Sequence, residues 1–436
     1  MELLLIKLVA LIRPLASMQH LEALFAVLGL GLFAVLLAVL FAHGATHRTL
    51  RLSAVDGVII AFAVWCLAIS GIYYDRVQIG EVAKLLVPVL SYTIVKNVVQ
   101  DPSQYRQLLI WAMVGFAIPV LASVALIVTG GGAHYTSYWT GVVRWQGAYV
   151  GSHNLGHSMT LFLMMIAVYL AVRRADVPPA GAAPPRRFSS NALLALLAAS
   201  ALWCLYMSQV RTAIVGLLIF LTIYLFCYNK KFFLIAASSF AVLTLATVPY
   251  WLPALLPEFA MSQRGMEVKT MELGSGRPMF WLSDLTIFLR LPIDQQLAGV
   301  GIGARRGEEA GEVLYGHNDW LELLTQTGFV GVGLFIVLQI VIFRKIRRMP
   351  GTERYAFLAM FVAVNVMMVL SNSYTWRIQV GHLYYMMLAF IEVRALAALE
   401  APVPAAIAQD EPLRPLPKMS NVRTTGRMQY SNGSSK

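Results

Sequence analysis

The sequence predicts an all-α membrane protein that crosses the bilayer about 12 times. Of its 436 residues, 58% are hydrophobic and only 13% are charged, and the mean hydropathy is +0.67. A water-soluble domain of this length cannot hide so much apolar surface. The apolar runs are long and lack the alternation of β-barrel strands. Because a helix satisfies its own backbone hydrogen bonds in lipid, these runs are predicted to be helices.

Eleven apolar runs form clear candidate spans. They cover residues 21–42, 54–74, 79–99, 107–129, 156–172, 191–208, 210–228, 232–250, 328–343, 355–370 and 378–398. A twelfth run, Leu3 to Leu15, is interrupted by Lys7 and Arg13. It is either a short or tilted span or an interfacial helix, and it lacks the cleavage site of a signal peptide. Together the spans predict a single transmembrane domain over residues 1–400.

Basic residues gather on one side of the predicted bundle. They lie in short loops between spans, which explains the net charge of +12 without a nucleic-acid partner. The main clusters are Arg173, Arg174, Arg186 and Arg187; Lys230 and Lys231; and Arg344, Lys345, Arg347, Arg348 and Arg354. The positive-inside rule makes this side cytoplasmic. The tail 401–436 is Pro-rich, then polar and basic, and is predicted to be a disordered cytoplasmic extension.

The opposite face receives the longer polar loops. The largest, residues 251–316, contains a stretch from Pro278 to Leu291 with helical character. Its apolar side is predicted to carry Trp281, Leu285, Phe288 and Leu289. We expect a short helix there that lies along the membrane surface or caps a cavity.

His317 is the first candidate for chemistry, because it stands in a polar stretch just before a span. A histidine titrates near neutrality and can take a proton from a sugar hydroxyl. Asn318, Asp319 and Glu322 are close enough in sequence to orient the ring or a substrate hydroxyl. The alternative is an ordinary helix start in which Asn318 or Asp319 is the N-cap.

Several cations on the same face are candidates for anion binding. Arg211 begins a span, where a guanidinium needs an anion, a wet cavity or a route to the head groups. Arg277 follows Gly274-Ser-Gly and precedes the loop helix, so it suits a phosphate, although an exposed turn is the alternative. Arg264 is a similar candidate. Lys84 either lines a polar cavity or pairs with Glu81 at helical spacing.

A further external segment runs from Arg144 to His157. Asn154 is a candidate helix cap, and His157 is expected to face the bundle. His153 and His157 have the spacing of two metal ligands, but no third ligand is close in sequence, so no metal is predicted. No glycine-rich nucleotide cradle and no Asp-x-Asp pair is present. No cofactor is therefore predicted.

These segments together resemble the O-antigen ligase and polymerase superfamily of bacterial envelope glycosyltransferases. The resemblance rests on Arg144…Gly147…Asn154, on Ser208-Gln-Val-Arg211, on Gly274-Ser-Gly-Arg277…Trp281, and on His317-Asn…Glu322…Gln326-Thr-Gly328. It covers about residues 20–395, and the overall plan is most similar to that of the lipid A-core:O-antigen ligases. The family likeness implies a helical fold related to C-type glycosyltransferases and an inverting, metal-independent reaction.

The resemblance also implies substrates and roles. The donor is a glycan on undecaprenyl pyrophosphate, and the acceptor is lipid A-core at the periplasmic face of the inner membrane. His317 becomes the general base. Arg211 and Arg277, with Arg264 and Lys84, hold the pyrophosphate; Asn318, Glu322, Arg144, Asn154 and Trp281 support the site. Membrane lipids surround the bundle, and the sequence assigns no oligomeric state.

Three other functions stay open at the level of sequence. An O-antigen polymerase uses the same donor class but extends another carrier-linked glycan, and an O-oligosaccharyltransferase uses a protein hydroxyl. A transporter of lipid-linked glycans is disfavoured, because transporters place charges at mid-membrane and often show internal repeats, whereas the candidate groups here gather at one face.

Overall fold

A computed structural model describes residues 1–46, 50–73, 79–136, 143–175, 188–235, 237–239, 277–303, 318–371 and 377–400. The chain divides into two compact units, Met1–Ala397 and Ala398–Lys436. The helices and strands that surround the candidate residues belong to the first unit. His317, Arg264 and the tail 401–436 lie outside the described residues.

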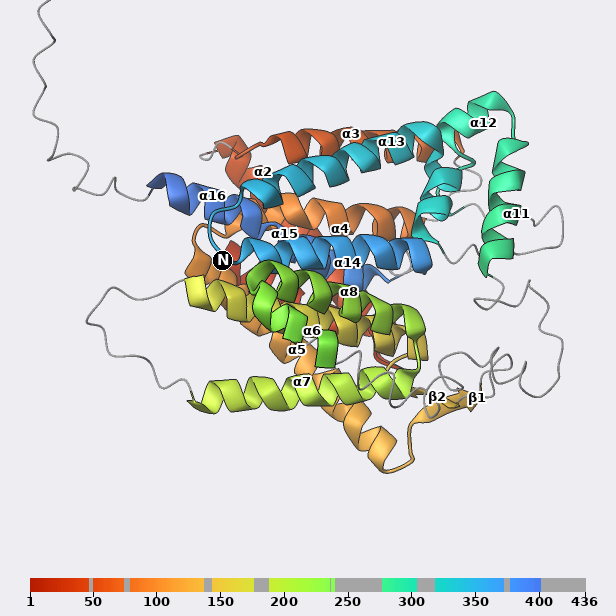
Figure 1. The fold of residues 1–436 in the computed structure, drawn as a ribbon. Coiled ribbons are helices and arrows are strands. Elements are labelled where there is room, and N and C mark those ends of the chain that lie inside the picture. The colour runs from red at the N-terminus through yellow and green to blue at the C-terminus, as the bar shows by residue number, and fades with distance from the viewer. Residues whose placement is uncertain are drawn as a thin grey trace, which may run out of the picture. The chain divides into compact units, whose positions relative to one another are not determined.

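The described part of the chain is helical apart from one two-stranded sheet, which confirms the all-α prediction (Figure 1). The elements are α1 (Glu2–Ile12), η1 (Arg13–Ser17), α2 (Glu22–Thr46), α3 (Ala54–Ile72), α4 (Ile79–Val98), α5 (Pro102–Val128), β1 (Ala133–Thr136), β2 (Val143–Gly147), α6 (Ser152–Ala175), α7 (Phe188–Ser208), α8 (Arg211–Tyr228), α11 (Arg277–Leu289), α12 (Ile293–Ala298), α13 (Asp319–Arg348), α14 (Arg354–Leu370), α15 (Ile378–Leu388) and α16 (Phe390–Glu400).

Eight helical segments of the described residues are long and apolar enough to cross a membrane, so the chain is a multi-pass membrane protein. They are α2, α3, α5, α6, α7, α8, α13 and the segment Gln379–Ala397. The predicted spans 79–99 and 355–370 do form helices, α4 and α14. However, α4 carries three charged residues and α14 has only 17 residues. The predicted span 232–250 extends beyond the described residues. The number of 12 spans is therefore not confirmed.

The N-terminal run is a short helix that packs against α2 and α5. Eleven residues rise about 16 Å, roughly half of the hydrocarbon thickness, so α1 does not span. A Cβ atom added at Gly115 of α5 would lie 2.3 Å from the carbonyl oxygen of Leu11, which shows how closely the two backbones approach. After α1 the chain turns at Pro14, and Met18 pairs with Tyr149 beyond β2.

Helix α13 is kinked at Gly328, whose φ of 66° and ψ of −173° are not helical. A Cβ atom there would lie 2.2 Å from the carbonyl oxygen of Leu297, so only glycine lets α12 approach this closely. The amide of Val300 also donates to the carbonyl of Thr325 at 2.9 Å. The kink directs the first turns of α13 away from the long span that follows.

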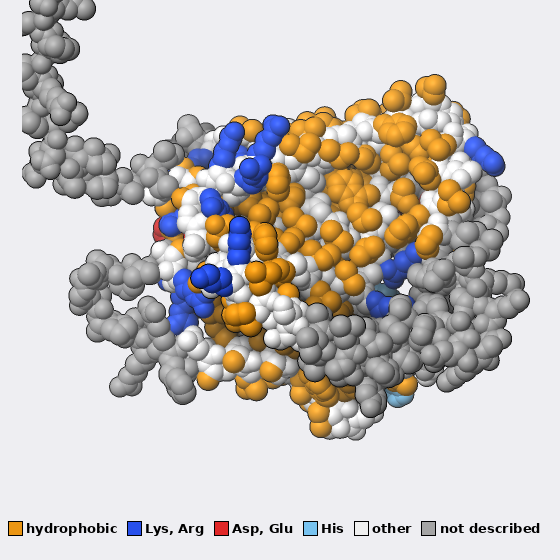
Figure 2. Space-filling model, in the orientation of Figure 1, with side chains coloured by type: hydrophobic (Ala, Val, Ile, Leu, Met, Phe, Trp, Pro, Cys, Tyr) orange, Lys and Arg blue, Asp and Glu red, His pale blue; other side chains and the backbone are white. Residues whose placement is uncertain are grey.

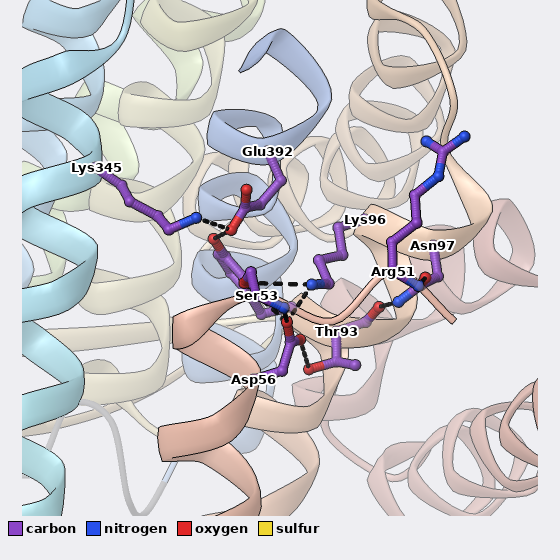
Figure 3. A network of polar contacts seen from close by, with 9 residues as sticks. Arg51, Ser53, Asp56, Thr93, Lys96, Asn97, Lys345 and Glu392 are labelled. Carbon is purple, nitrogen blue, oxygen red and sulfur yellow. Dashed lines mark hydrogen bonds and ion pairs between the residues drawn. The ribbon is translucent and has the colours of Figure 1, made fainter. Parts of the chain in front are cut away.

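One end of the molecule is basic and is held together by paired charges. Figure 2 shows Lys and Arg side chains gathered at the left end, with apolar side chains over the middle. Figure 3 shows the network inside this end. Asp56 accepts hydrogen bonds from Ser53 and Thr93 and pairs with Lys96, and both members of this pair are buried.

A second ion pair extends the network to the C-terminal helices. Lys345 Nζ of α13 lies 2.6 Å from Glu392 Oε1 of α16 (Figure 3). Tyr92 of α4 donates to the same carboxylate at 3.1 Å. The network thus ties α3, α4, α13 and α16 together. A buried charge that keeps its partner and its hydrogen bonds avoids most of the penalty of leaving water.

Candidate functional site

Four arginines from separate parts of the chain converge at the end of the bundle away from this network. Arg144 lies on β2, Arg211 begins α8, Arg277 begins α11 and Arg377 precedes α15. We call these residues the arginine cluster. The charges of Arg144, Arg211 and Arg377 are all close enough to that of Arg277 for the repulsion to alter pKa values. The sequence predicted the first three members, and the structure brings them together.

Arg277 joins α11 to the end of α14. Its Nη1 atom donates a hydrogen bond to the carbonyl oxygen of Leu370, the last residue of α14. The final carbonyls of a helix have no partner within that helix, so they accept from side chains. Burial lowers the pKa of Arg277, and the charges of Arg144 and Arg211 lower it further. The guanidinium is therefore held in a place where an anion is favoured.

Arg211 is placed by the tight turn that precedes it. Ser208 Oγ donates to the carbonyl of Leu205 at 2.6 Å and accepts from the amide of Val210 at 3.3 Å. A Cβ atom at Gly156 of α6 would lie only 2.8 Å from Val210 Cβ. Ser208 closes the turn, and Gly156 lets α6 pack against it. The presence of a serine and a glycine at these two positions is thus explained by the structure.

Arg144 is presented by the antiparallel hairpin of β1 and β2, in which it lies opposite Tyr135. The hydroxyl of Tyr135 lies 2.9 Å from Ser152 Oγ, which ties the hairpin to the start of α6. Gly147 ends the hairpin with a φ of 59°, and a Cβ atom there would meet Ser123 Oγ at 2.5 Å. Among the described residues, the buried Nε atom of Arg144 has no hydrogen-bond partner.

Arg377 is a member of the cluster that the sequence analysis missed. Burial lowers its pKa to about 10; Asp319 at the start of α13 opposes this shift, and Arg277 adds to it. Its Nε and Nη1 atoms are buried and have no hydrogen-bond partner in the described ranges. The sequence could have marked Arg377 as a candidate. It is an arginine on the face opposite the basic clusters, where the positive-inside rule predicts few cations.

His157 lies beside the cluster as well. It is fully buried on α6, as expected for a side chain that faces the bundle, and Nε2 is 3.4 Å from Ser371 Oγ. Its ring lies within electrostatic range of Arg277 and Arg377. The start of α6 and the end of α14 therefore contribute a histidine and a serine next to the guanidinium groups.

The other predicted residues have local roles in the structure. Lys84 Nζ pairs with Glu81 Oε1 at 2.5 Å, which is the alternative that the sequence left open. Asn318 is the N-cap of α13 and accepts from the amides of Trp320 and Leu321 at 2.9 and 3.2 Å. The N-cap alternative for this residue is thus confirmed. Glu322 Oε1 accepts from Gln326 Nε2 at 3.0 Å.

Two details of the predicted site are wrong. Helix α6 begins at Ser152, so Asn154 lies within its first turn and does not cap it. On α11 the buried residues include Asp284 and Phe288, with Trp281 partly buried, whereas Leu285 and Leu289 are exposed. An aspartate thus takes part in the face that was predicted to be apolar, because α11 packs this side, with Phe288 against Phe329, onto the protein.

The fold and the site together define a multi-pass membrane protein with a cluster of guanidinium groups at one end, a feature suited to an anionic substrate. A protein-family model described as O-Antigen ligase matches residues 193–336, a segment that contains Arg211 and Arg277. That family covers ligases and polymerases, so the match implies an enzyme that transfers glycans from lipid-linked substrates. No curated protein matches the chain.

The site predicts an unusual effect of Arg377→Met on stability. Burial removes the Arg377 guanidinium from water, and the attraction of Asp319 does not offset this cost, because the pKa of Arg377 is still lowered. Methionine carries no such cost, so we expect the free protein to gain about 1 kcal/mol of stability and to unfold at a higher temperature. The control is Arg394→Met, which removes the partner of the fully buried Glu353 and should destabilise the protein. Thermal unfolding in detergent measures both. Equal destabilisation by the two variants contradicts the prediction.

Proposed function

We propose that the protein transfers O-antigen glycan from undecaprenyl pyrophosphate to lipid A-core oligosaccharide at the periplasmic face of the bacterial inner membrane. The observation that carries this proposal is the arginine cluster, half-buried at the end of the bundle away from the basic loops. The family match over residues 193–336 supports the choice of a lipid-linked glycan as donor.

The reaction balances with side chains of this chain alone. A hydroxyl of the acceptor sugar attacks the anomeric carbon of the donor from the side opposite the pyrophosphate, so the configuration inverts. His317 takes the hydroxyl proton. The bond between the anomeric carbon and the pyrophosphate oxygen breaks, and the carrier pyrophosphate leaves with the electron pair.

The arginine cluster suits the leaving pyrophosphate. A guanidinium presents a planar fork that matches phosphate oxygens, and its hydrogen bonds strengthen in a partly dry site. The cluster is held in place by Leu370, by the Ser208 turn and by the β1–β2 hairpin. Its repulsion is therefore already present in the free protein, and an incoming anion relieves it. Donors aligned before the reaction stabilise the developing charge most effectively.

The start of α13 links the proposed base to the cluster. His317 is joined by one peptide bond to Asn318, the residue that caps α13, and the next residue, Asp319, interacts with Arg377. The proposal therefore assigns His317 the role of general base, and Arg144, Arg211, Arg277 and Arg377 the role of binding pyrophosphate. Arg264 and Lys84 are assigned to the same donor site by resemblance alone.

The second candidate is an O-antigen polymerase, because the matched family includes both activities. A polymerase has the same donor site and differs in its acceptor, which is a second carrier-linked glycan. An O-oligosaccharyltransferase differs in the same way, with a protein hydroxyl as acceptor.

Reconstitution of the full chain in liposomes tests the proposed acceptor. We expect glycan-capped lipid A-core when undecaprenyl-pyrophosphate glycan and lipid A-core are both present, and no product without lipid A-core. Longer carrier-linked glycans without added acceptor would show a polymerase instead.

The variant His317→Ala tests the proposed general base. It should insert and unfold as the wild type does but yield no product; full transfer by this variant removes His317 from the mechanism.

Arg277→Lys tests whether the fork of the guanidinium matters. Lysine keeps the charge but can neither reach the carbonyl of Leu370 in the same geometry nor bind a phosphate with two parallel bonds. We expect kcat to fall about 100-fold, the usual order for loss of one donor to a developing oxyanion. The matched control is Arg290→Lys, an exposed residue just after α11. Equal rates for the two variants would rule out bidentate binding by Arg277.

A further inference from the structure

A partly open cavity of about 420 Å³ lies between α6 and α7 at the basic end of the bundle. Arg173 and Arg174 in the last turn of α6 line it together with apolar residues, Ile166 and Leu170 on α6 and Leu194 on α7. The volume falls within the range of sites for small ligands. The cavity is distinct from the arginine cluster, because α6 carries His157 in its second turn and these arginines in its last turn.

The cavity exists because α7 presents small side chains to α6. Ala195 and Ala198 line it where larger residues would fill the space. Much of α7 is also left uncovered by the protein, since 28% of its span Asn191–Ser208 is buried, compared with 78% for α6. An apolar molecule in this cavity would therefore add contacts that the protein itself does not supply.

Hydrogen bonds connect the two arginines to different neighbouring helices, Arg173 to α7 and Arg174 to α8. Arg173 Nη1 donates to Asn191 Oδ1 of α7 at 3.1 Å. Arg174 Nη1 lies 3.4 Å from the hydroxyl of Tyr228 on α8, and its guanidinium carbon is 6.0 Å from the centre of that ring. These contacts orient the two groups, and the planar fork of a guanidinium matches phosphate oxygens.

The arrangement of positive charge and apolar surface in the cavity is complementary to an anionic phospholipid. From Arg173 to Ile166 the helix descends seven residues, or about 10 Å, from a cationic layer into an apolar one. A soluble anion would gain nothing from the apolar wall, and a neutral lipid would gain nothing from the two guanidinium groups. Basic sites between helices on the cytoplasmic side are typical binding sites of anionic lipid head groups.

We propose that this cavity binds one anionic phospholipid of the leaflet at the basic end of the bundle. Its phosphate lies between Arg173 and Arg174, and one acyl chain lies along Leu170 and Leu194. The lipid fills the gap between α6 and α7 and so braces α7, whose other end carries the Ser208 turn that positions Arg211. The proposal does not depend on which glycan acceptor the enzyme uses.

Native mass spectrometry of the full chain in detergent tests this site. The protein is titrated with phosphatidylglycerol and, separately, with phosphatidylcholine of the same acyl chains. We expect the wild type to bind one phosphatidylglycerol tightly. The double variant Arg173→Ala/Arg174→Ala should bind phosphatidylglycerol at least about tenfold more weakly. The matched control is Arg347→Ala/Arg348→Ala, an adjacent exposed pair at the same end of the molecule, with Arg347 near the ring of Phe343. This control should bind as the wild type does.

A second variant separates a built site from general attraction to a basic surface. Ala198→Leu fills the apolar part of the cavity and leaves both arginines in place, so it should also weaken phosphatidylglycerol binding several-fold. Glycerol 3-phosphate, which lacks acyl chains, should not bind at comparable concentration.

Four results would overturn the proposal. They are equal binding of phosphatidylcholine, equal loss in the Arg347/Arg348 control, no effect of Ala198→Leu, and tight binding of glycerol 3-phosphate.

Discussion

The cost of removing charge from water is the constraint on which the structure depends. At the basic end this cost is met by partners: Asp56 pairs with Lys96, Glu392 with Lys345 and Glu353 with Arg394. At the opposite end the pattern is reversed, because four guanidinium groups share one partly buried region. The negative charge of Asp319 partly offsets the burial of one of them, Arg377. This contrast between satisfied charge in one place and gathered like charge in another is the basis of the proposal that the second place receives an anion.

Close backbone contacts allow that gathering. Gly156 admits the turn before Arg211, Gly147 places the hairpin that carries Arg144, and Gly328 lets α12 lie against the kinked α13. Each position would clash if it carried a Cβ atom, and two of them have positive φ. The glycines thus act at a distance from the chemistry: they set backbone positions, and the backbone sets where the guanidinium groups lie.

Two helices connect the ends of the molecule. Helix α13 carries Asp319 beside Arg377 at its start and Lys345 of the paired network at its other end. Helix α6 carries His157 beside the arginine cluster, and its last turn carries Arg173 and Arg174, which line the cavity. Helix α6 is continuous between these two ends, whereas α13 is kinked at Gly328, so α6 is the stiffer connection between the cavity and the arginine cluster.

Hydropathy and charge in the sequence alone determined the helical membrane fold, the basic end, the loop helix near Pro278, and the candidates Arg211 and Arg277, whereas Arg144 came from the family resemblance. These are local properties, because composition, periodicity and the cost of a lone cation in an apolar run need no knowledge of neighbours. Tertiary structure decided that α1 packs against α2 and α5, that Lys84 pairs with Glu81, that Arg377 belongs to the arginine cluster, and that His157 lies beside it. Those outcomes depend on which helices meet, and residues as far apart in the chain as Arg144 and Arg377 meet only through packing.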